Sequence, residues 1–484
     1  MALDVPVIGL EVHVQLRTRT KLFCGCGAGF GAPPNHLTCP VCLGLPGALP
    51  VLNAEAVRLA VRAALALHMA VTPHSRFARK NYFYPDLPKG YQITQHDRPL
   101  ATGGWLEVPL PGGGAARVAL AQLHLEEDSG KSLHAAAGGA GGSRLDFNRA
   151  GAPLAEIVTE PCLGSPEEAA DFLRALHARL TFAGVTTGRM EEGALRCDAN
   201  VSLRDPATGD GTERVEVKNL NSFRFVERAL AHEVSRQREA VASGAVVARE
   251  TRLFDPGSGA TAVLREKETF EDYRYFPDPD LPPLVVGEAL LAQERHRRDE
   301  APEALRTRFR TEMGLPDYDA GVLTQDRETA AYFEAVARRC ADPKAASNWV
   351  MTEVLRQVKA HGGDWTRLRV HPEELGALLA QVAEGRLSTA LAKAVFARMA
   401  ESGEEAGTAV RALGGPVVRD GETLSALVDE ALRAQPRAAE DVRAGHGRAL
   451  GVLVGEVLRR SGGRAEPRAA RRLLRVRLGL DAEE

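Results

Sequence analysis

Three acidic residues and a lysine stand close together in the stretch HLEEDSGKSLH. Glu126, Glu127 and Asp128 precede a Gly-Lys-Ser that resembles the end of a phosphate-binding loop, but Leu125 replaces the first glycine of that loop. Backbone amides therefore cannot wrap a phosphate in the usual way. The acids are still suited to hold Mg²⁺ against phosphate oxygens while Lys131 touches the nucleotide directly. A solvated acidic turn fits this stretch equally well when it is taken alone.

Polar residues alternate with apolar ones in three further segments, LEVHVQL, LRCDANVSLR and RVEVKN. Successive side chains of a strand point to opposite faces, so each segment predicts a strand with one apolar and one polar row. An ordinary solvent-facing strand also alternates. These polar rows hold short acids, histidine, asparagine and arginine, whereas a merely solvated face is expected to carry more threonine, lysine and glutamate. The rows include Glu11, His13, Arg196, Asp198, Asn200, Glu216 and Lys218.

If these strands lie in one antiparallel sheet, their polar rows converge into a site for a divalent metal ion and a nucleotide. Its acids and histidine are Glu11, His13, Glu126, Glu127, Asp198 and Glu216. Carboxylates with one imidazole favour Mg²⁺ or Mn²⁺ over Zn²⁺, and Arg196, Lys131 and Lys218 are candidates to contact phosphate. Phosphoryl transfer needs mainly positioning and charge neutralisation, and the sequence shows no Ser-His-Asp arrangement or G-x-S-x-G motif.

Four of the seven cysteines form two pairs in the pattern C-G-C-x₁₂-C-P-V-C. Four thiolates fill a tetrahedral zinc shell and leave no open position, so the spacing predicts a structural zinc site at Cys24, Cys26, Cys39 and Cys42. A redox C-x-x-C pair is the alternative, and the second pair one short loop away argues against it. The other cysteines are scattered singly, which suits a reducing compartment.

A sheet must position these residues, and a chain of 484 residues is long enough for roughly two to four domains. Up to about residue 290 the sequence indicates short strands with occasional helices, one of them marked by the cap Ser165, Pro166 and Glu168. Helical spacing dominates afterwards, as in 371–385. The predicted fold is α+β, a mainly antiparallel sheet with helices followed by an all-α part. No apolar run of about 18 residues and no leader are seen, so a cytoplasmic protein is expected.

Charge is distributed unevenly along the chain. Between Leu432 and Leu478 there are 12 arginines against 4 acidic residues, although the net charge of the whole chain is −3. A basic end on an acidic body suggests a polyanionic partner. A helical surface that happens to use arginine is the alternative.

Eight segments occur in the order typical of one family: IGLEVHVQL, CPVCLGLPGALPVLN, RKNYFYPDLPKGYQIT, LHLEEDSGKS, DFNRAGAPLAEIVTEP, MEEGALRCDANVSLR, EVKNLNSF and DYRYFPDPD. Over nearly its whole length the chain resembles the B subunits of bacterial aspartyl/glutamyl-tRNA amidotransferases, the GatB family. The resemblance implies a catalytic cradle domain at 1–293 with a zinc-ribbon-like insertion at 22–44. It also implies a helical domain at 294–405 and a YqeY-like tail domain at 406–484 that binds tRNA.

The resemblance further implies a ligase reaction that uses ATP and Mg²⁺. The side-chain carboxylate of Glu on tRNA(Gln), or of Asp on tRNA(Asn), is phosphorylated, and ammonia then displaces the phosphate to give the amide. The implied partners are an amidase (the A subunit) that releases ammonia from glutamine, a small C subunit that completes a heterotrimer, the mischarged tRNA and the non-discriminating synthetase that charges it. No Ser-Ser-Lys amidase signature is found in this chain, so ammonia is expected from the partner.

Matching motifs carry residue roles onto this chain. The implied Mg²⁺ ligands are His13, Glu127, Asp198 and Glu216, with Glu11 and Glu156 beside them. The whole predicted catalytic set is Glu11, His13, Glu126, Glu127, Asp128, Lys131, Glu156, Arg196, Asp198, Asn200, Glu216 and Lys218. Segments 80–89 and 273–278 resemble parts of the family near the ammonia route and the rim of the active site. Only some members carry four cysteines, so the zinc prediction rests on the spacing in this sequence.

In the tail, one helix is predicted to pack on an apolar stripe that begins at Leu450 and ends at Leu458. Arginines outside this stripe are then left to face RNA, whose phosphates attract them. The predicted tRNA-binding residues are Arg448, Arg459, Arg460, Arg471 and Arg472.

A tRNA-binding scaffold with a zinc ribbon and no chemistry of its own is the second hypothesis. The basic tail and the cysteines fit both hypotheses. The acidic rows fit only the enzyme, since clustered carboxylates repel a polyanion unless a cation intervenes.

Overall fold

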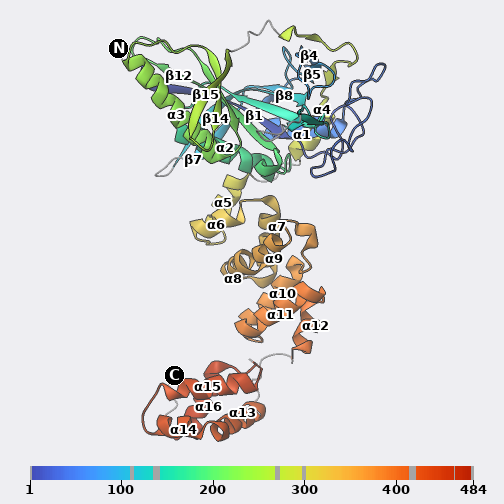
Figure 1. Ribbon diagram of the computed structural model, residues 1–484. Coiled ribbons are helices and arrows are strands. Elements are labelled where there is room, and N and C mark those ends of the chain that lie inside the picture. Colours follow the sequence, from blue (N-terminus) through green and yellow to red (C-terminus); the bar gives the residue numbers. More distant parts are fainter. Residues whose placement is uncertain are drawn as a thin grey trace. The chain divides into compact units, whose positions relative to one another are not determined.

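A computed structural model describes residues 3–109, 114–133, 142–266, 273–296, 301–413, 421–462 and 464–480. Its internal contacts divide the chain into two compact units, Met1–Pro302 and Glu303–Glu484. The named strands all belong to the first unit, and the second unit is built of helices (Figure 1). The predicted α+β fold, with the sheet first and the helices after it, is confirmed. The finer division into three domains at residues 293 and 405 stays a prediction.

One large sheet runs through the first unit in the order β15-β14-β13-β12-β1-β11-β8-β5-β4-β16. Its neighbours pair antiparallel except β13 and β14, which are parallel. The strands on this path are β1 (Val5–Gln15), β4 (Ala78–Asn81), β5 (Tyr91–Thr94), β8 (Ala115–Glu127), β11 (Pro153–Thr159), β12 (Leu195–Arg204), β13 (Val215–Leu220), β14 (Glu250–Asp255), β15 (Ala260–Glu266) and β16 (Phe276–Pro277). The shorter strands are β2 (Ala70–Val71), β6 (Ala101–Thr102) and β7 (Trp105–Pro109) beside β8, the pair β3 (His74–Ser75) and β17 (Leu284–Val285), and the pair β9 (Lys131–Leu133) and β10 (Arg144–Asp146).

The large sheet has one apolar and one polar face because its side chains alternate. On β1, Leu10, Val12 and Val14 are buried in a core that three helices share. These helices are α1 (Ala54–Ala66), α2 (Pro166–Phe182) and α3 (Phe223–Ala242). Helix α3 also makes the crossover between the parallel strands β13 and β14. The polar rows on the opposite face are thereby left available for a site.

Side-chain caps fix where the first helices begin. Helix α2 starts as the sequence predicts, because Ser165 Oγ accepts a hydrogen bond from the backbone N–H of Glu168 at 3.1 Å. The Glu168 carboxylate accepts one from the backbone of Gly164 at 2.7 Å. Helix α1 begins after Asn53, whose side-chain oxygen accepts from the backbone of Glu55 at 2.9 Å. Each cap supplies a partner to an N–H that the helix itself cannot satisfy.

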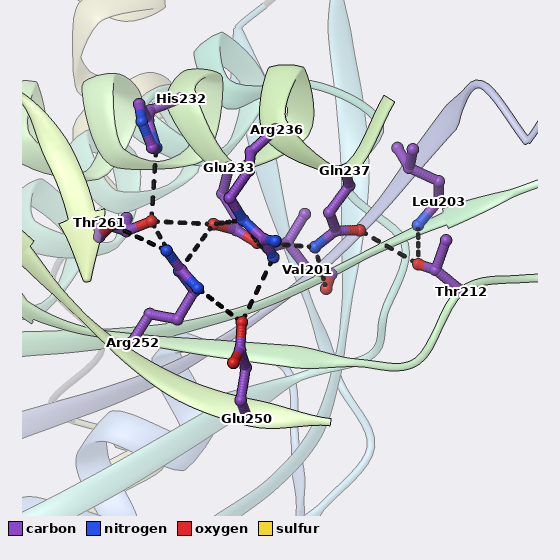
Figure 2. A network of polar contacts seen from close by, with 10 residues as sticks. All are labelled: Val201, Leu203, Thr212, His232, Glu233, Arg236, Gln237, Glu250, Arg252 and Thr261. Carbon is purple, nitrogen blue, oxygen red and sulfur yellow. Dashed lines mark hydrogen bonds and ion pairs between the residues drawn. The ribbon is translucent and has the colours of Figure 1, made fainter. Parts of the chain in front are cut away.

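A buried polar network fastens helix α3 to strands β14 and β15 (Figure 2). Glu233 is fully buried and accepts hydrogen bonds from Arg236 at 3.0 Å and from Gln237 at 3.1 Å. From the sheet, Thr261 Oγ1 donates to the same carboxylate at 3.0 Å, and the guanidinium of Arg252 lies 3.4 Å from it. A buried carboxylate is tolerated only when it is paired and hydrogen-bonded in this way. The helix and the two strands are therefore held in one arrangement.

Helices make up the rest of the described chain. Helix α4 (Glu288–His296) belongs to the first unit, where its Glu294 pairs with Arg62 of α1 at 2.7 Å. The helices that follow are α5 (Pro302–Thr311), α6 (Asp317–Leu323), α7 (Arg327–Cys340), α8 (Pro343–Trp349), α9 (Leu355–Ala360), α10 (Pro372–Ala383), α11 (Thr389–Ser402), α12 (Ala406–Ala412), α13 (Gly421–Ala434), α14 (Pro436–Arg443), α15 (Ala449–Arg460) and α16 (Pro467–Arg477). Among the described residues, none of these helices combines the length and the apolar composition that crossing a membrane requires.

Two predicted helices of the second unit are confirmed. Helix α10 buries Leu375 and Leu378 of its apolar stripe and is followed by Gly385 at a φ of +68°, a backbone conformation that suits glycine. Helix α15 buries Leu453 and Val457 in a core that it shares with α13, α14 and α16.

Candidate active site and metal centre

The polar rows of neighbouring strands face one groove with a volume of ≈ 680 Å³. Glu11 on β1 lies opposite Asp198 on β12, and His13 lies between Arg196 on β12 and Glu156 on β11. Directly opposed residues of an antiparallel pair share a face, so alternation does bring these side chains together. The predicted residues that line the groove are Glu11, His13, Glu126, Asp128, Glu156, Arg196, Asp198, Glu216 and Lys218.

Two histidines and two glutamates meet within this groove. His124 Nε2 lies 2.8 Å from Glu156 Oε2, and His13 Nε2 lies 3.3 Å from Glu126 Oε1. The crossed distances are 3.6 Å between His13 and Glu156 and 3.8 Å between His124 and Glu126. Two carboxylates this close together repel each other, and the imidazoles between them relieve the repulsion.

The charges of this cluster shift all four pKa values. Burial by itself would lower the pKa of His13, but Glu156 and Glu126 outweigh it and raise the pKa to about 9. The same opposition raises the pKa of His124 to about 10. Burial would raise the pKa of Glu126, yet the two histidines hold it well below its usual value, and the pKa of Glu156 is lowered likewise. These directions favour protonated imidazoles beside ionised carboxylates, and a metal ion that binds an imidazole here would displace its proton.

The cluster offers a set of metal ligands. One ligand atom from each of His13, Glu126 and Glu156 lies within 4.8 Å of the other two. Carboxylate oxygens with imidazole suit Mg²⁺ or Mn²⁺, so the donor set fits the expected metal. It shares His13 with the predicted ligand set.

Two other predicted ligands, Asp198 and Glu216, lie in the groove beside Lys218. The Lys218 ammonium lies 2.5 Å from Asp198 Oδ2 and 3.2 Å from Glu216 Oε1. Burial would lower the pKa of Lys218, but the two carboxylates raise it above its usual value. On the other side Thr251 of β14 donates to Glu216 Oε2 at 2.9 Å. These acids therefore hold a cation of the protein itself in this structure.

Further cations line the groove. Arg196 Nη2 lies 2.7 Å from Asp128 Oδ2, and this carboxylate is the largest cause that raises the pKa of Arg196. Lys80 Nζ lies 4.8 Å from the ring centre of Tyr273, a cation–π contact. Together with Lys218, these side chains place three positive charges next to the acid cluster. Such an arrangement can bind phosphate oxygens while a metal ion neutralises others.

Three predicted residues take other positions. Glu127 follows Glu126 on β8 and points away from the groove, where its carboxylate pairs with Lys89 and accepts from the backbone of Ile93 at 2.8 Å. Lys131 is exposed on β9, and neither it nor Glu127 is among the described residues that line the groove. Asn200 lines a smaller neighbouring cavity together with Glu11 and donates to the Glu11 carboxylate at 2.9 Å. The roles assigned to all three stay predictions.

Several lining residues were absent from the predicted catalytic set. One of them is His124, which pairs with Glu156 in the cluster. The alternation along β8 could have found it, because it puts His124 in one row with Gln122 and Glu126. Lys80 and Tyr273 belong to segments 80–89 and 273–278, whose resemblance to the family carried no role for single residues. The other lining residues outside the predicted set include Tyr82, Gln92, Thr94, Gln95, His96, Arg214, Arg249 and Tyr275.

The four paired cysteines meet as the spacing predicts. Their Sγ atoms all lie within 4.8 Å of one another, and those of Cys39 and Cys42 are 3.9 Å apart. The backbone N–H of Cys39 donates to Cys42 Sγ at 3.1 Å. Four thiolates at this separation match the closed shell of a structural zinc ion, so the donor set fits that metal.

The predicted tRNA-binding arginines differ in what they contact. Arg448, Arg471 and Arg472 are exposed. Arg459 and Arg460 both pair with Glu456, with their closest atoms 2.6 Å and 2.7 Å from its carboxylate. Two of the five arginines therefore already have an acidic partner within the tail, whereas the remaining three present their charge to solvent.

Comparison with known proteins detects similarity along the chain. A family profile described as the GatB/GatE catalytic domain matches residues 6–292, and one described as the GatB domain matches residues 331–478. The B subunit of the aspartyl/glutamyl-tRNA(Asn/Gln) amidotransferase of Geobacter sulfurreducens is 47% identical over 473 residues, 98% of each chain. The B subunits of the same name from Halorhodospira halophila and from Synechococcus sp. (strain JA-3-3Ab) are 48% and 43% identical, covering 98% of this chain and 98% and 97% of theirs. The similarity thus spans the groove, the cysteines and the helical tail.

Proposed function

Because the chain belongs to the family of aspartyl/glutamyl-tRNA(Asn/Gln) amidotransferase B subunits, we propose that it converts Glu on tRNA(Gln), Asp on tRNA(Asn), or both, into the amide. The observation that carries this proposal is the groove, where acids that suit Mg²⁺ lie beside cations that suit phosphate. A scaffold that only binds tRNA would have no use for an acid cluster that repels RNA. Family membership and the groove therefore favour the enzyme over the scaffold.

The proposed reaction has two steps. A side-chain carboxylate oxygen of the mischarged aminoacyl group attacks the γ-phosphorus of ATP, and ADP leaves. Ammonia then attacks the carbonyl carbon of the acyl phosphate, inorganic phosphate leaves, and the amide remains after loss of a proton. Neither step needs a nucleophile from the protein, which agrees with a groove built of charged side chains.

Different residues of the groove would bind the metal ion and the phosphate groups. His13, Glu126 and Glu156 would hold Mg²⁺, with Asp198 and Glu216 in reach of the same groove. When bound, Mg²⁺ supplies positive charge to the phosphate oxygens of ATP. Arg196, Lys218 and Lys80 bind and orient the phosphate groups and the acyl phosphate, since all three line the groove. Tyr273 and Tyr275 also line the groove, and ammonia would enter on their side.

The proposal includes partners that this chain does not itself contain. Ammonia is supplied by an amidase, the A subunit, which hydrolyses glutamine, and a small C subunit completes a heterotrimer in the cytoplasm. The mischarged tRNA is delivered by a non-discriminating synthetase. Exposed arginines of the tail, Arg471 and Arg472 among them, grip the tRNA body through its phosphates while its acylated end reaches the groove.

The cysteine cluster is proposed to bind one structural zinc ion. Its four thiolates leave no open position for a substrate. The zinc ion would therefore stabilise the loop that carries the cysteines and take no part in the chemistry.

The test uses the complex reconstituted with its amidase and small partners, with Glu-tRNA(Gln) and Asp-tRNA(Asn) as substrates. Asp198→Asn and Glu126→Gln are expected to abolish tRNA-dependent ATP hydrolysis and amide formation, while hydrolysis of glutamine by the partner stays measurable. Asp171→Asn is the matched control, because Asp171 forms an ion pair with Arg174 on α2, outside the groove. Transamidation by either groove variant at the wild-type rate would refute the proposed site.

A further inference from the structure

Lys21 is a fully buried lysine without a carboxylate partner. Its Nζ donates to the backbone carbonyls of Leu37 at 2.6 Å and Phe147 at 3.3 Å, and to Cys42 Sγ at 3.5 Å. Among the described residues, no carboxylate oxygen lies within 4.0 Å of this ammonium. A buried ammonium ion is costly unless an anion compensates its charge. The cysteine cluster, which Lys21 contacts through Cys42, is the group that can supply that anion.

The charge of a zinc-loaded cluster would match this need. Four thiolates around one divalent cation leave two excess negative charges in a partly buried site. The Lys21 ammonium removes one of them through its contact with Cys42. Among the described residues, Lys21 has two backbone carbonyls and this sulfur as the partners of its ammonium. The positive charge of Lys21 and the excess negative charge of the thiolate centre therefore offset each other in the protein interior.

The two carbonyls that Lys21 binds belong to loops that are hydrogen-bonded together. Leu37 lies in the loop between the two cysteine pairs, and its N–H donates to the side chain of Asn148 at 2.8 Å. Asn35 of the same loop accepts from the backbone of Phe147 at 2.8 Å. Asn148 returns a hydrogen bond to the carbonyl of Pro33 at 2.7 Å. The cysteine loop and the segment around Phe147 thus form one unit, with Lys21 at its centre.

This unit continues into the groove through Arg149. The Arg149 guanidinium donates to the carbonyls of Ser129 at 3.1 Å and Gly130 at 2.7 Å, and it lies 3.3 Å from the Asp128 carboxylate. Asp128 in turn pairs with Arg196, one of the cations proposed to bind phosphate. Chain connectivity from Phe147 to Arg149 therefore joins the cysteine cluster to one wall of the groove.

We infer that Lys21 is the counter-charge of the metal-thiolate centre and the positioning residue through which that centre holds the turn Asp128–Gly130 in place. Lys21 touches no substrate and acts through Phe147 and Arg149. This inference rests on the proposed zinc centre and not on the proposed reaction. A lysine that merely pins two loops would stabilise the protein without changing how tightly zinc is held.

The first test measures zinc affinity of the full chain by competition with a chromophoric chelator. Lys21→Gln keeps a hydrogen-bond donor but removes the charge, and it is expected to weaken zinc binding about 10- to 100-fold, as loss of an outer partner of a metal ligand does. The matched control is Asn35→Gly, which removes the two hydrogen bonds of the Asn35 side chain between the loops, changes no charge and suits the φ of +63° at this position. Wild-type affinity in Lys21→Gln, or an equal loss in Asn35→Gly, would overturn the inference.

The second test needs no variant and so does not depend on whether Lys21→Gln folds. Hydrogen exchange of the wild-type chain is followed before and after zinc is removed. Peptides that cover 144–152 and 127–131 are expected to exchange faster in the zinc-free chain, whereas peptides of α3 stay unchanged. Faster exchange confined to 24–42 would overturn the link to the groove. A chain that takes up no zinc would refute the centre itself, and neither test uses ATP or tRNA, so a failure of the proposed reaction is seen separately.

Discussion

The buried network between helix α3 and strands β14 and β15 leads to a specific prediction about Glu233. Glu233→Gln preserves the shape of the side chain but removes the charge that Arg236 and Arg252 share (Figure 2). Breaking a buried ion pair by removing one partner typically costs about 3–5 kcal/mol. Arg252 retains Glu250 at 2.6 Å, so we expect a value near the lower end, about 3 kcal/mol.

The measurement is local, because the chain has two compact units and a single unfolding transition is not assured. Hydrogen exchange of peptides from α3, β14 and β15 reports the free energy of opening in this region. A loss of about 3 kcal/mol corresponds to an opening equilibrium on the order of 100-fold more favourable. The control is Asp171→Asn, whose exposed pair with Arg174 is worth less than about 1 kcal/mol.

Two results would refute this reasoning. Exchange in Glu233→Gln that resembles the Asp171→Asn control would mean that the buried charge contributes no more than an exposed one. Equal loss of protection in the helices of the second unit would mean that the effect is not confined to α3 and its strands.

The network around Glu233 is also linked to the groove through β14. Thr251, which contacts Glu216, stands between Glu250 and Arg252 on this strand.

Three further predictions concern the tail, the histidines and the cysteines. Replacing Arg471 and Arg472 with alanine should weaken tRNA binding and reduce its salt dependence by about one unit of slope per lost phosphate contact. Arg459→Ala should weaken tRNA binding less, because the Arg459 side chain already pairs with Glu456. Binding measured at two salt concentrations checks both expectations. In metal-free protein the pKa values of His13 and His124, about 9 and about 10, exceed the value near 6.5 that both have in the unfolded chain. The two histidines should therefore stabilise the folded state fully below pH 6.5, and this contribution should disappear as the pH rises through 9 to 10. Midpoints of unfolding measured across that pH range test this prediction. A midpoint that does not change with pH, or one that changes equally in the wild type and in His124→Asn, would contradict it. Elemental analysis should find one zinc ion per chain in the wild type and in Asp198→Asn but not in Cys39→Ser, and zinc retained by Cys39→Ser would argue against the four-thiolate site.

Much of the fold could be predicted because its signals are local. Alternation in LEVHVQL and LRCDANVSLR marks β1 and β12, and the cap at Ser165 marks the start of α2. Each of these patterns reflects contacts within a few residues, so it can be recognised without knowing the rest of the structure.

The groove was only partly predictable because its assembly depends on pairing between distant segments. Alternation assigns the adjacent residues Glu126 and Glu127 to opposite faces of β8, and the structure places only Glu126 in the groove. The same rule places His124 with Glu126, but no local pattern shows that β11 will bring Glu156 to it. The pairing of β12 with β13 also has an irregular register between Cys197 and Ala199, which no local pattern of the sequence indicates. Such registers follow from long-range packing and turn geometry.

The strand order of the sheet has a consequence during synthesis of the chain. Strand β1 leaves the ribosome before the other named strands, yet its partners β11 and β12 lie at Pro153–Thr159 and Leu195–Arg204. At translation rates of about 5–20 residues per second, β1 waits roughly 10–40 seconds before both edges can be paired. Through much of that interval its apolar row, with Leu10, Val12 and Val14, lacks the part of the core that α2 and α3 later supply. A nascent chain of this protein therefore passes through a stage in which it exposes an aggregation-prone strand, and chaperones that shield such segments should bind it most strongly before residue 204 has emerged.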